Sequence, residues 1–112
     1  MAALSISSRV QRGHAVAELV GDFDIFTAAK CRKALADLID AGYVDLVVDL
    51  DRLDFLDSSG LGVLVGVLRK ARSHGGSVRL VCVRPNMLRM FHTTGLGKVF
   101  DIYPARGAVQ QV

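Results

Sequence analysis

A hydroxyl-rich segment at positions 57–60, Asp-Ser-Ser-Gly, carries the side chains best suited to chemistry in this sequence. It lies between an apolar run at 45–50 and a glycine-punctuated apolar run at 61–68. A serine at such a strand-to-helix junction is a good N-cap, because its oxygen accepts a hydrogen bond from the first turn. The same hydroxyl, on the rim of a sheet, is open to a covalent modification that a partner can read. Both interpretations of Ser58 are compatible with each other.

The patterns of common enzyme sites are absent from the sequence. A nucleophile elbow requires Gly-x-Ser-x-Gly, and the segment around Ser58 lacks the first glycine. Gly60, Gly62 and Gly66 fail the spacing of a dinucleotide site and fall within a predicted helix, where we assign them to close packing on a sheet. The chain has no phosphate-loop lysine and no His or Cys group at metal-ligand spacing. We therefore expect no enzymatic activity, no metal and no cofactor.

Two pairs of acids lie near the predicted helix starts. Asp49 and Asp51, or Asp22 and Asp24, offer ligands for a cation, but no motif supports a cation site. Acidic residues in such places usually form turns or caps. For Asp22 and Asp24, turn formation and contact with a partner both remain open.

Phosphorylation of Ser58 would add about −1.5 to −2 charges at neutral pH. The N-terminus of the following helix would favour the phosphate through its free N–H groups and its dipole. Asp57 would oppose it by like-charge repulsion, as would Asp22 and Asp24 if their loop lies alongside. The larger effect would fall on a docked partner, which would meet a dianion in place of a neutral hydroxyl. Such a modification would switch binding without refolding.

The elements that position this segment follow from hydrophobic periodicity and turn residues. Alternating or continuous apolar runs predict strands at 4–7, 14–20, 43–50, 77–83 and 98–103. Helical spacing predicts helices at 27–41, 59–74 and 85–95. Thr27 is the expected N-cap of the first helix, Gly42 and Gly95 are expected to end helices, and Pro85 to begin one. Residues 21–24 read as a polar loop.

This order of elements predicts an α/β fold: a mixed, mostly parallel sheet packed with three to four helices. The chain of 112 residues makes one domain, with its core at about 4–103 and a loose tail at 104–112. Ser58 then lies at the carboxyl end of a central strand, where ligands and partners of open α/β sheets tend to bind.

Composition restricts the setting in which the protein works. Hydrophobic residues make up 51% of the chain, yet no apolar stretch reaches the ~18 residues of a membrane span. We expect a soluble, cytoplasmic protein without membrane insertion, with Cys31 and Cys82 reduced and buried. The net charge of +3 suggests nucleic acid as a partner. Because the basic residues are scattered or lie on predicted helix faces, we expect no direct nucleic-acid binding.

The motif Asp-Ser-Ser-Gly-Leu-Gly at 57–62 is accompanied by other recognisable segments. They are Gly-Asp-Phe-Asp-Ile-Phe-Thr-Ala at 21–28, Val-Val-Asp-Leu at 47–50, Gly-Gly-Ser-Val at 75–78, and Pro85 with Phe91 and Thr-Gly-Leu at 94–96. Together, over nearly the whole chain, these segments resemble the STAS domain of anti-sigma factor antagonists. The first motif is the specific part of this resemblance.

The resemblance implies a partner-switching regulator of transcription. An anti-sigma factor that is itself an ATP-dependent serine kinase would phosphorylate Ser58. The unphosphorylated protein would bind this anti-sigma factor and free a sigma factor, the phosphorylated protein would let go, and a PP2C-type serine phosphatase would reset it. The partner-binding residues implied by the resemblance are Asp22, Asp24, Asp57, Ser59 and Gly60.

Two other functions remain as alternatives. One is a stand-alone STAS scaffold subunit of a membrane lipid-transport ATPase, which would use the same fold without a switch. The other is a module that binds a small molecule or nucleotide in a crevice at the rim. The intact Ser58 within its motif favours the partner-switching regulator.

Overall fold

The structure, a computed structural model, describes residues 3–105. Its strands are β1 (Leu4–Gln11), β2 (His14–Phe23), β3 (Asp45–Leu56), β4 (Ser77–Val81) and β5 (Asp101–Tyr103). Its helices are α1 (Ala28–Asp40), α2 (Ser58–Ser73), α3 (Pro85–Thr93) and the short 3-10 helix η1 (Leu96–Lys98). The predicted order of strands and helices is confirmed. From residue 106 onward, the predicted loose tail lies outside the described residues.

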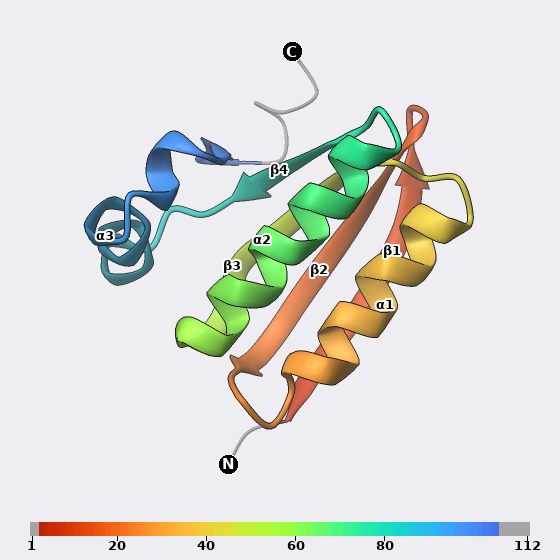
Figure 1. Ribbon diagram of the computed structural model, residues 1–112. Coiled ribbons are helices and arrows are strands. Elements are labelled where there is room, and N and C mark those ends of the chain that lie inside the picture. The colour runs from red at the N-terminus through yellow and green to blue at the C-terminus, as the bar shows by residue number, and fades with distance from the viewer. Residues whose placement is uncertain (1–2, 106–112) are drawn as a thin grey trace.

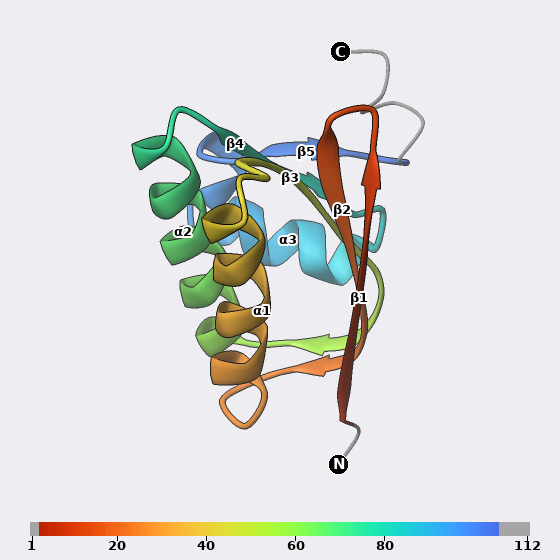
Figure 2. The ribbon, with the colours of Figure 1, turned by 90° about the vertical axis from the view of Figure 1, so that its right-hand side faces the viewer.

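The strands form one sheet in the order β1-β2-β3-β4-β5. The first pair is antiparallel and the other three are parallel, which confirms a mixed, mostly parallel sheet. Parallel neighbours need a crossover connection, and the helices provide one between each pair. Helices α1 and α2 lie side by side over one face of the sheet, and α3 follows the end of β4 (Figures 1 and 2). The central strand is β3, as expected.

Helix boundaries follow the predicted caps. Thr27 occupies the N-cap position of α1, and Gly42 follows the C-cap with a φ of 101°. Pro85 begins α3, and Gly95 follows its C-cap with a φ of 79°. A positive φ costs glycine little, so these two positions end the helices cleanly.

Strands β2 and β3 both run further than predicted. Residues 21–23, predicted as loop, are the end of β2, and β3 continues to Leu56 instead of ending at residue 50. Polar residues obscured the extension of β3, because only Leu53 and Leu56 are buried there and an irregularity in the pairing with β2 sets them three residues apart. Beyond Asp49 the partner of β3 is β2 alone, since β4 pairs only as far as that residue. The β2–β3 pair therefore projects past β4, and past β1 only at its last residues, because β1 still pairs with β2 as far as Gly21.

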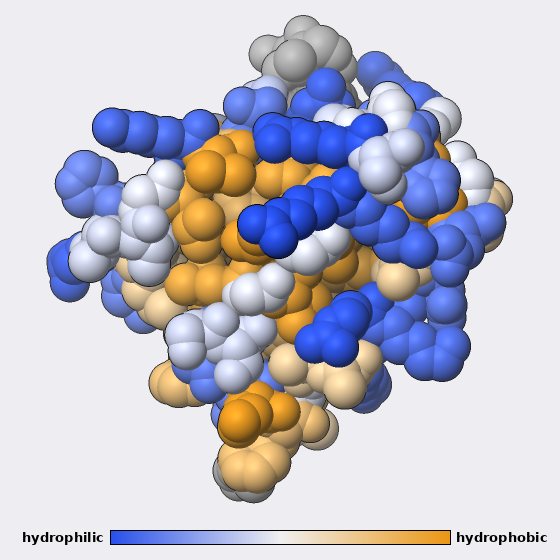
Figure 3. Space-filling view, in the orientation of Figure 1, coloured by the Kyte–Doolittle hydropathy of each residue, from blue (hydrophilic) through white to orange (hydrophobic). Residues whose placement is uncertain are grey.

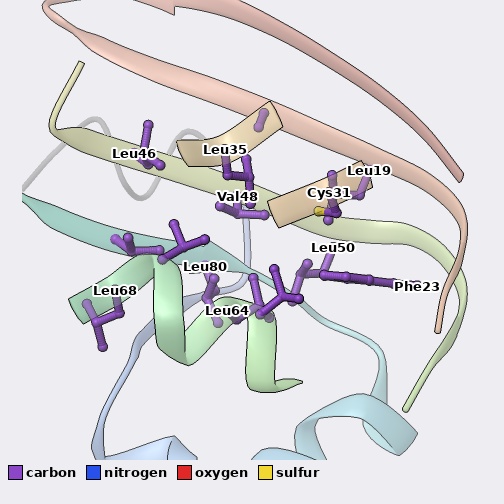
Figure 4. Packing of buried hydrophobic residues seen from close by; sticks show 14 of the residues in the cluster. Leu19, Phe23, Cys31, Leu35, Leu46, Val48, Leu50, Leu64, Leu68 and Leu80 are labelled. Atoms are coloured by element: carbon purple, nitrogen blue, oxygen red, sulfur yellow. The ribbon is translucent and has the colours of Figure 1, made fainter. Parts of the chain in front are cut away.

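The main core lies between the sheet and helices α1 and α2. Side chains from the strands point toward the two helices in the close-up view (Figure 4). The labelled members are Leu19, Phe23, Cys31, Leu35, Leu46, Val48, Leu50, Leu64, Leu68 and Leu80. A smaller cluster of Val16, Val47 and Val81, with Tyr103 against it, forms apart from this core. The apolar faces of α1 and α2 thus pack on one face of the sheet and form the main core with it.

Both cysteines are free and buried, as expected. Cys31 lies in the main core with no exposed surface, and burial raises the pKa of its thiol to about 12. Burial also raises the pKa of the Cys82 thiol. Because the thiolate is the reactive species, both side chains should be chemically inert in the folded protein.

We expect both thiols to resist Ellman's reagent at about pH 8 in the native protein and to react once guanidinium unfolds it. The raised pKa of Cys31 also has a stability consequence. The unfolded thiol ionises near pH 9 while the folded thiol stays neutral, so stability is full below that pH and falls as pH rises toward about 12. Urea titrations across this range measure the loss.

The variant Cys31→Ala is the matched control for the alkaline loss of stability. It removes the titrating group, so its free energy of unfolding should fall less steeply with alkaline pH than that of the wild type. Rapid labelling of two thiols in the folded protein, or an identical pH slope in the variant, would contradict the burial argument.

Candidate functional site

Two strand-to-helix junctions lie side by side at the projecting end of the sheet. Phe23 and Leu56 are register partners at the ends of β2 and β3, and the Asp57 N–H donates to the Phe23 carbonyl at 3.3 Å. The β2–α1 loop therefore adjoins the start of α2, as Figure 1 shows at the lower end of the molecule. The segment that carries Asp22 and Asp24 therefore lies alongside Ser58.

Asp57, not Ser58, caps α2. The Asp57 backbone is extended, and its Oδ1 accepts hydrogen bonds from the N–H groups of Ser59 at 2.9 Å and Gly60 at 3.2 Å. Ser58 is already the first residue of the helix. The interpretation of Ser58 as the N-cap is therefore wrong, because the carboxylate one position earlier reaches the same N–H groups.

The hydroxyl of Ser58 does not contribute to the helix cap. Its side chain is exposed and makes no hydrogen bond to any described residue, whereas Ser59 is half-buried. The N–H groups of Ser59 and Gly60, expected to receive a phosphate, already donate to Asp57. A phosphate on Ser58 would keep the favourable helix dipole but would meet a carboxylate where free donors were expected.

The β2–α1 loop is held by reciprocal hydrogen bonds between Asp24 and Thr27. Asp24 Oδ1 accepts from the N–H groups of Phe26 at 2.9 Å and Thr27 at 3.1 Å. Thr27 Oγ1 accepts from the Asp24 N–H at 3.0 Å and donates to the Asp22 carbonyl at 2.8 Å. Asp24 is buried, which confirms its turn-forming role. Asp22 lies within β2, so turn formation was the wrong interpretation for it.

The two junctions together form an acidic rim, which we define as residues 21–27 and 53–60. Its carboxylates are Asp22, Asp24, Asp54 and Asp57, and it contains no Lys or Arg. This local excess of negative charge stands out in a chain of net charge +3. Phosphorylation would therefore make this already acidic surface more negative.

The sequence analysis missed two exposed apolar residues in the β2–α1 loop, and a third, Phe55, lies elsewhere on the rim. Ile25 and Phe26 are 69% and 74% exposed, although both have the character of core residues. The signal that points to them is their position between Asp24 and Thr27, two turn-forming residues that leave no strand or helix to bury what lies between. A hydrophobic pair within a polar turn is unusual enough to single out from sequence.

Gly60 is the one glycine of α2 that packs closely. A Cβ at this position would lie 2.6 Å from Leu56 Cδ1 and 3.0 Å from both the ring and the carbonyl oxygen of Phe23. At Gly62 and Gly66 a Cβ would meet nothing within 4 Å. The close-packing interpretation is confirmed for Gly60 and wrong for the other two, which face outward from the helix.

Neither of two cavities in the structure involves the acidic rim. One, of about 310 Å³, is lined by residues of β1 and β2 such as Ser7 and Glu18. The other, of about 610 Å³, lies against α3 and η1, near Phe91 and Lys98. Over residues 3–105, no group of three His, Cys, Asp or Glu side chains is arranged to hold a metal. No helix in that range is long and apolar enough to cross a membrane.

The sheet order, the crossover helices and the rim motif define a STAS-type fold. Residues 5–109 match the STAS domain, and the chain belongs to this family. It is 34% identical over 93 residues to the anti-sigma-B factor antagonist of Bacillus subtilis, covering 82% of this chain and 84% of that protein. It is 32% identical over 101 residues to the anti-sigma F factor antagonist of Paenibacillus polymyxa, covering 89% and 86%.

Solved structures with the same fold include two proteins of this kind. An anti-sigma factor antagonist from Mycobacterium paratuberculosis superposes with a TM-score of 0.89 at 28% identity, over 97% of this chain and 92% of that one. The unphosphorylated form of the antagonist SpoIIAA gives 0.75 at 25% identity, over 97% and 96%. The phosphorylated form of Bacillus SpoIIAA gives 0.73 at 26% identity, over 97% and 98%.

The cap assignment predicts different costs for two adjacent substitutions. Asp57→Ala should lower the free energy of unfolding by ~1 kcal/mol, because two N–H groups of α2 lose their acceptor. Ser58→Ala should change it by less than ~0.5 kcal/mol, since that hydroxyl is exposed and unbonded. Urea denaturation of both variants measures the difference, and a larger loss for Ser58→Ala would reverse the assignment.

Gly60 and Gly62 offer a matched pair within one helix turn. Gly60→Ala should destabilise the protein by ~1–3 kcal/mol, because the new methyl group meets Leu56 and the Phe23 backbone. Gly62→Ala should stabilise it by up to ~1 kcal/mol, since alanine favours the helix and the space is open. Thermal melting of the two variants is the measurement, and shifts in the same direction would argue against close packing at Gly60.

Proposed function

We propose that the protein is a cytoplasmic anti-sigma factor antagonist that phosphorylation of Ser58 releases from its partner. The observation that carries the proposal is the exposed, unbonded Ser58 hydroxyl on the acidic rim of a STAS domain. Similarity to antagonists of sigma B and sigma F pathways supports the partner class. SpoIIAA, a structural neighbour, exists in unphosphorylated and phosphorylated forms, which supports the mode of control.

In the unphosphorylated state, the rim is the surface that docks on the anti-sigma factor. Asp22, Asp57 and Ser59 are partly exposed and are proposed to lie against the partner. Gly60 is buried and shapes the junction by letting α2 approach Phe23. Asp24 is buried as well, so its part is to hold the loop that the partner contacts. Docking would occupy the anti-sigma factor and so free a sigma factor.

The chain supplies the acceptor for phosphoryl transfer, and the kinase supplies the catalysis. The anti-sigma factor would bind ATP and place its γ-phosphorus in line with the Ser58 hydroxyl. The bond between that phosphorus and the β,γ-bridging oxygen breaks as Ser58 Oγ–P forms, the hydroxyl proton passes to a base of the kinase, and ADP leaves. A PP2C-type phosphatase would return the serine by hydrolysis. Apart from the Ser58 hydroxyl, no group of this chain needs to give up or accept a proton.

Release follows from the charge that the phosphate adds to the rim. Its four carboxylates would be joined by a phosphate of about −1.5 to −2 charges, taking the rim from about −4 to about −6. The N–H groups of Ser59 and Gly60 already serve Asp57, so these two donors are not free to offset the new charge. In the complex, the phosphoserine would also face the phosphates of the nucleotide left on the kinase. Desolvation and repulsion together favour dissociation.

The test is a titration of the anti-sigma factor with Ser58 variants. Ser58→Ala should bind as tightly as the wild type, within about twofold, because the hydroxyl has no packing role, but ATP should no longer release it. Ser58→Glu should bind at least tenfold more weakly through like-charge repulsion. Ser59→Ala is the matched control, and it should retain release by ATP. Equal affinity of Ser58→Ala and Ser58→Glu would sink the electrostatic account.

The modification itself can be read from cells. Mass spectrometry of the tryptic peptide spanning residues 53–69 distinguishes a phosphate on Ser58 from one on Ser59. Phosphate on Ser58 that rises and falls with growth or stress is the expected result. Its consistent absence would favour a scaffold role for the domain, and stable co-purification with a membrane lipid-transport ATPase would then identify that role.

A further inference from the structure

We infer that Ile25 and Phe26 form a hydrophobic anchor that enters an apolar pocket on the anti-sigma factor, beside the site that receives Ser58. This inference rests on the proposed function and extends it, because it separates the residues that give affinity from the residue that switches it. Four observations carry it: exposure, rigidity, position and charge.

Ile25 and Phe26 are the most exposed large hydrophobic side chains among the described residues. The others in this class are Val10 and Val83 at 55%, Phe55 at 49% and Val99 at 40%. Only Ile25 and Phe26 combine adjacency in sequence with such exposure. In the space-filling view, hydrophobic surface projects at the lower end of the molecule, where the β2–α1 loop lies in the same orientation (Figures 1 and 3). A hydrophobic projection that contributes nothing to the core is a candidate contact.

The loop that presents this pair is held in one conformation. The N–H of Phe26 donates to Asp24 Oδ1, and Thr27 bonds back to both Asp24 and the Asp22 carbonyl. Binding therefore does not have to order the backbone, which removes an entropic cost that a mobile loop would bear. A rigidly presented aromatic side chain is the kind of residue that dominates interface energetics. Asp24 thus acts as a positioning residue for Phe26.

The pair lies close to Ser58. The carbonyl of Phe23 bonds the N–H of Asp57, and Phe26 is only three residues along the chain, a span of at most ~11 Å. A standard interface buries roughly 800 Å² on each partner, equivalent to a disc of roughly 16 Å radius. Because that radius is comparable to the separation of the loop from Ser58, we expect a kinase centred on Ser58 to contact the β2–α1 loop as well.

The carboxylates around the anchor indicate what kind of partner surface would bind it. The apolar pair is surrounded by the carboxylates of the acidic rim, among which Asp22 and Asp57 are partly exposed. The complementary surface is an apolar pocket bordered by Lys or Arg side chains. A second copy of this chain does not offer that combination at its own rim, which repeats the same acidic charge. The anchor is assigned to the anti-sigma factor because its kinase must reach Ser58 on the same rim; the cavity beside Phe91 and Lys98 of a second copy is the competing receptor that the experiment must separate.

The experiment measures the affinity of anchor variants for the anti-sigma factor. Each serine-kinase anti-sigma factor of the source bacterium is purified and titrated with wild-type protein, and the one that binds serves as the probe. Ile25→Ser and Phe26→Ser should each raise Kd at least tenfold, as loss of an interface hot spot does. Val10→Ser, at an exposed position on the distant β1–β2 hairpin, should leave Kd within about twofold. Melting temperatures should be unchanged in all three variants, because the side chains are exposed.

A second arm separates the anchor from the switch. The Phe26→Ser substitution should raise Kd by the same factor in the Ser58 and Ser58→Ala backgrounds, because the anchor does not act through the hydroxyl. At saturating concentrations the Phe26→Ser protein should still accept phosphate on Ser58 and still be released by ATP. A raised KM with little change in kcat for phosphorylation is the kinetic form of this result.

Each remaining outcome overturns a distinct claim. If the wild type binds and ATP releases it, while Phe26→Ser and Ile25→Ser bind as tightly as wild type, the anchor is refuted and the switch stands. If Phe26→Ser abolishes a dimer seen by analytical ultracentrifugation and leaves kinase affinity intact, the pair is a self-association surface and the inference fails. If the wild type binds none of the anti-sigma factors, the proposed function fails and the anchor with it.

Discussion

The hydrogen bond from the Asp57 N–H to the Phe23 carbonyl joins the two halves of the functional surface. It extends the pairing of β2 and β3 to their last residues, so that both strands turn into their helices at one place. Gly60 makes this possible, because a side chain there would collide with Leu56 and Phe23. That close approach holds the start of α2 against the end of β2, so the Ser58 hydroxyl and the β2–α1 loop lie on one surface. The rim exists as one surface because of backbone pairing and one missing Cβ.

The capping of α2 determines how a phosphate on Ser58 would act in the proposed switch. A helix N-terminus normally offers N–H donors to an anion, but here Asp57 already occupies those of Ser59 and Gly60. A phosphate on Ser58 is then tolerated by the helix dipole without being neutralised by the chain. Its charge is instead displayed outward on a rim that holds four carboxylates and no basic residue. A phosphate charge that the protein itself does not neutralise would act on the partner bound at the rim.

The rim carries two kinds of side chain, apolar residues that can give affinity and a serine that can control binding. Ile25 and Phe26 present apolar area in a fixed loop, which favours contact in any modification state of the serine. Ser58 contributes little area, and in the proposed function it is the residue whose charge the kinase changes. We propose that affinity and control are separated in this way, so that release need not dismantle the surface that gives recognition. Many of the basic residues that set the net charge lie on helices, but Arg84 donates to the Leu53 carbonyl and so reaches the edge of this rim.

The sequence alone was sufficient for the element order, the mixed sheet and the buried cysteines, because hydrophobic periodicity and helix-ending glycines are local signals. It also singled out Ser58, since the surrounding motif is contiguous. It misplaced the helix cap by one residue and ended β2 and β3 too early, because capping and strand pairing depend on which groups meet in space. The roles of Gly60 and Gly62 look alike in sequence, and only the approach of Phe23 to one of them makes them different. Local sequence signals thus determined the elements and pointed to Ser58 as a candidate site. The juxtaposition of the β2–α1 loop with Ser58 was decided by tertiary pairing, which brings together backbone atoms far apart along the chain.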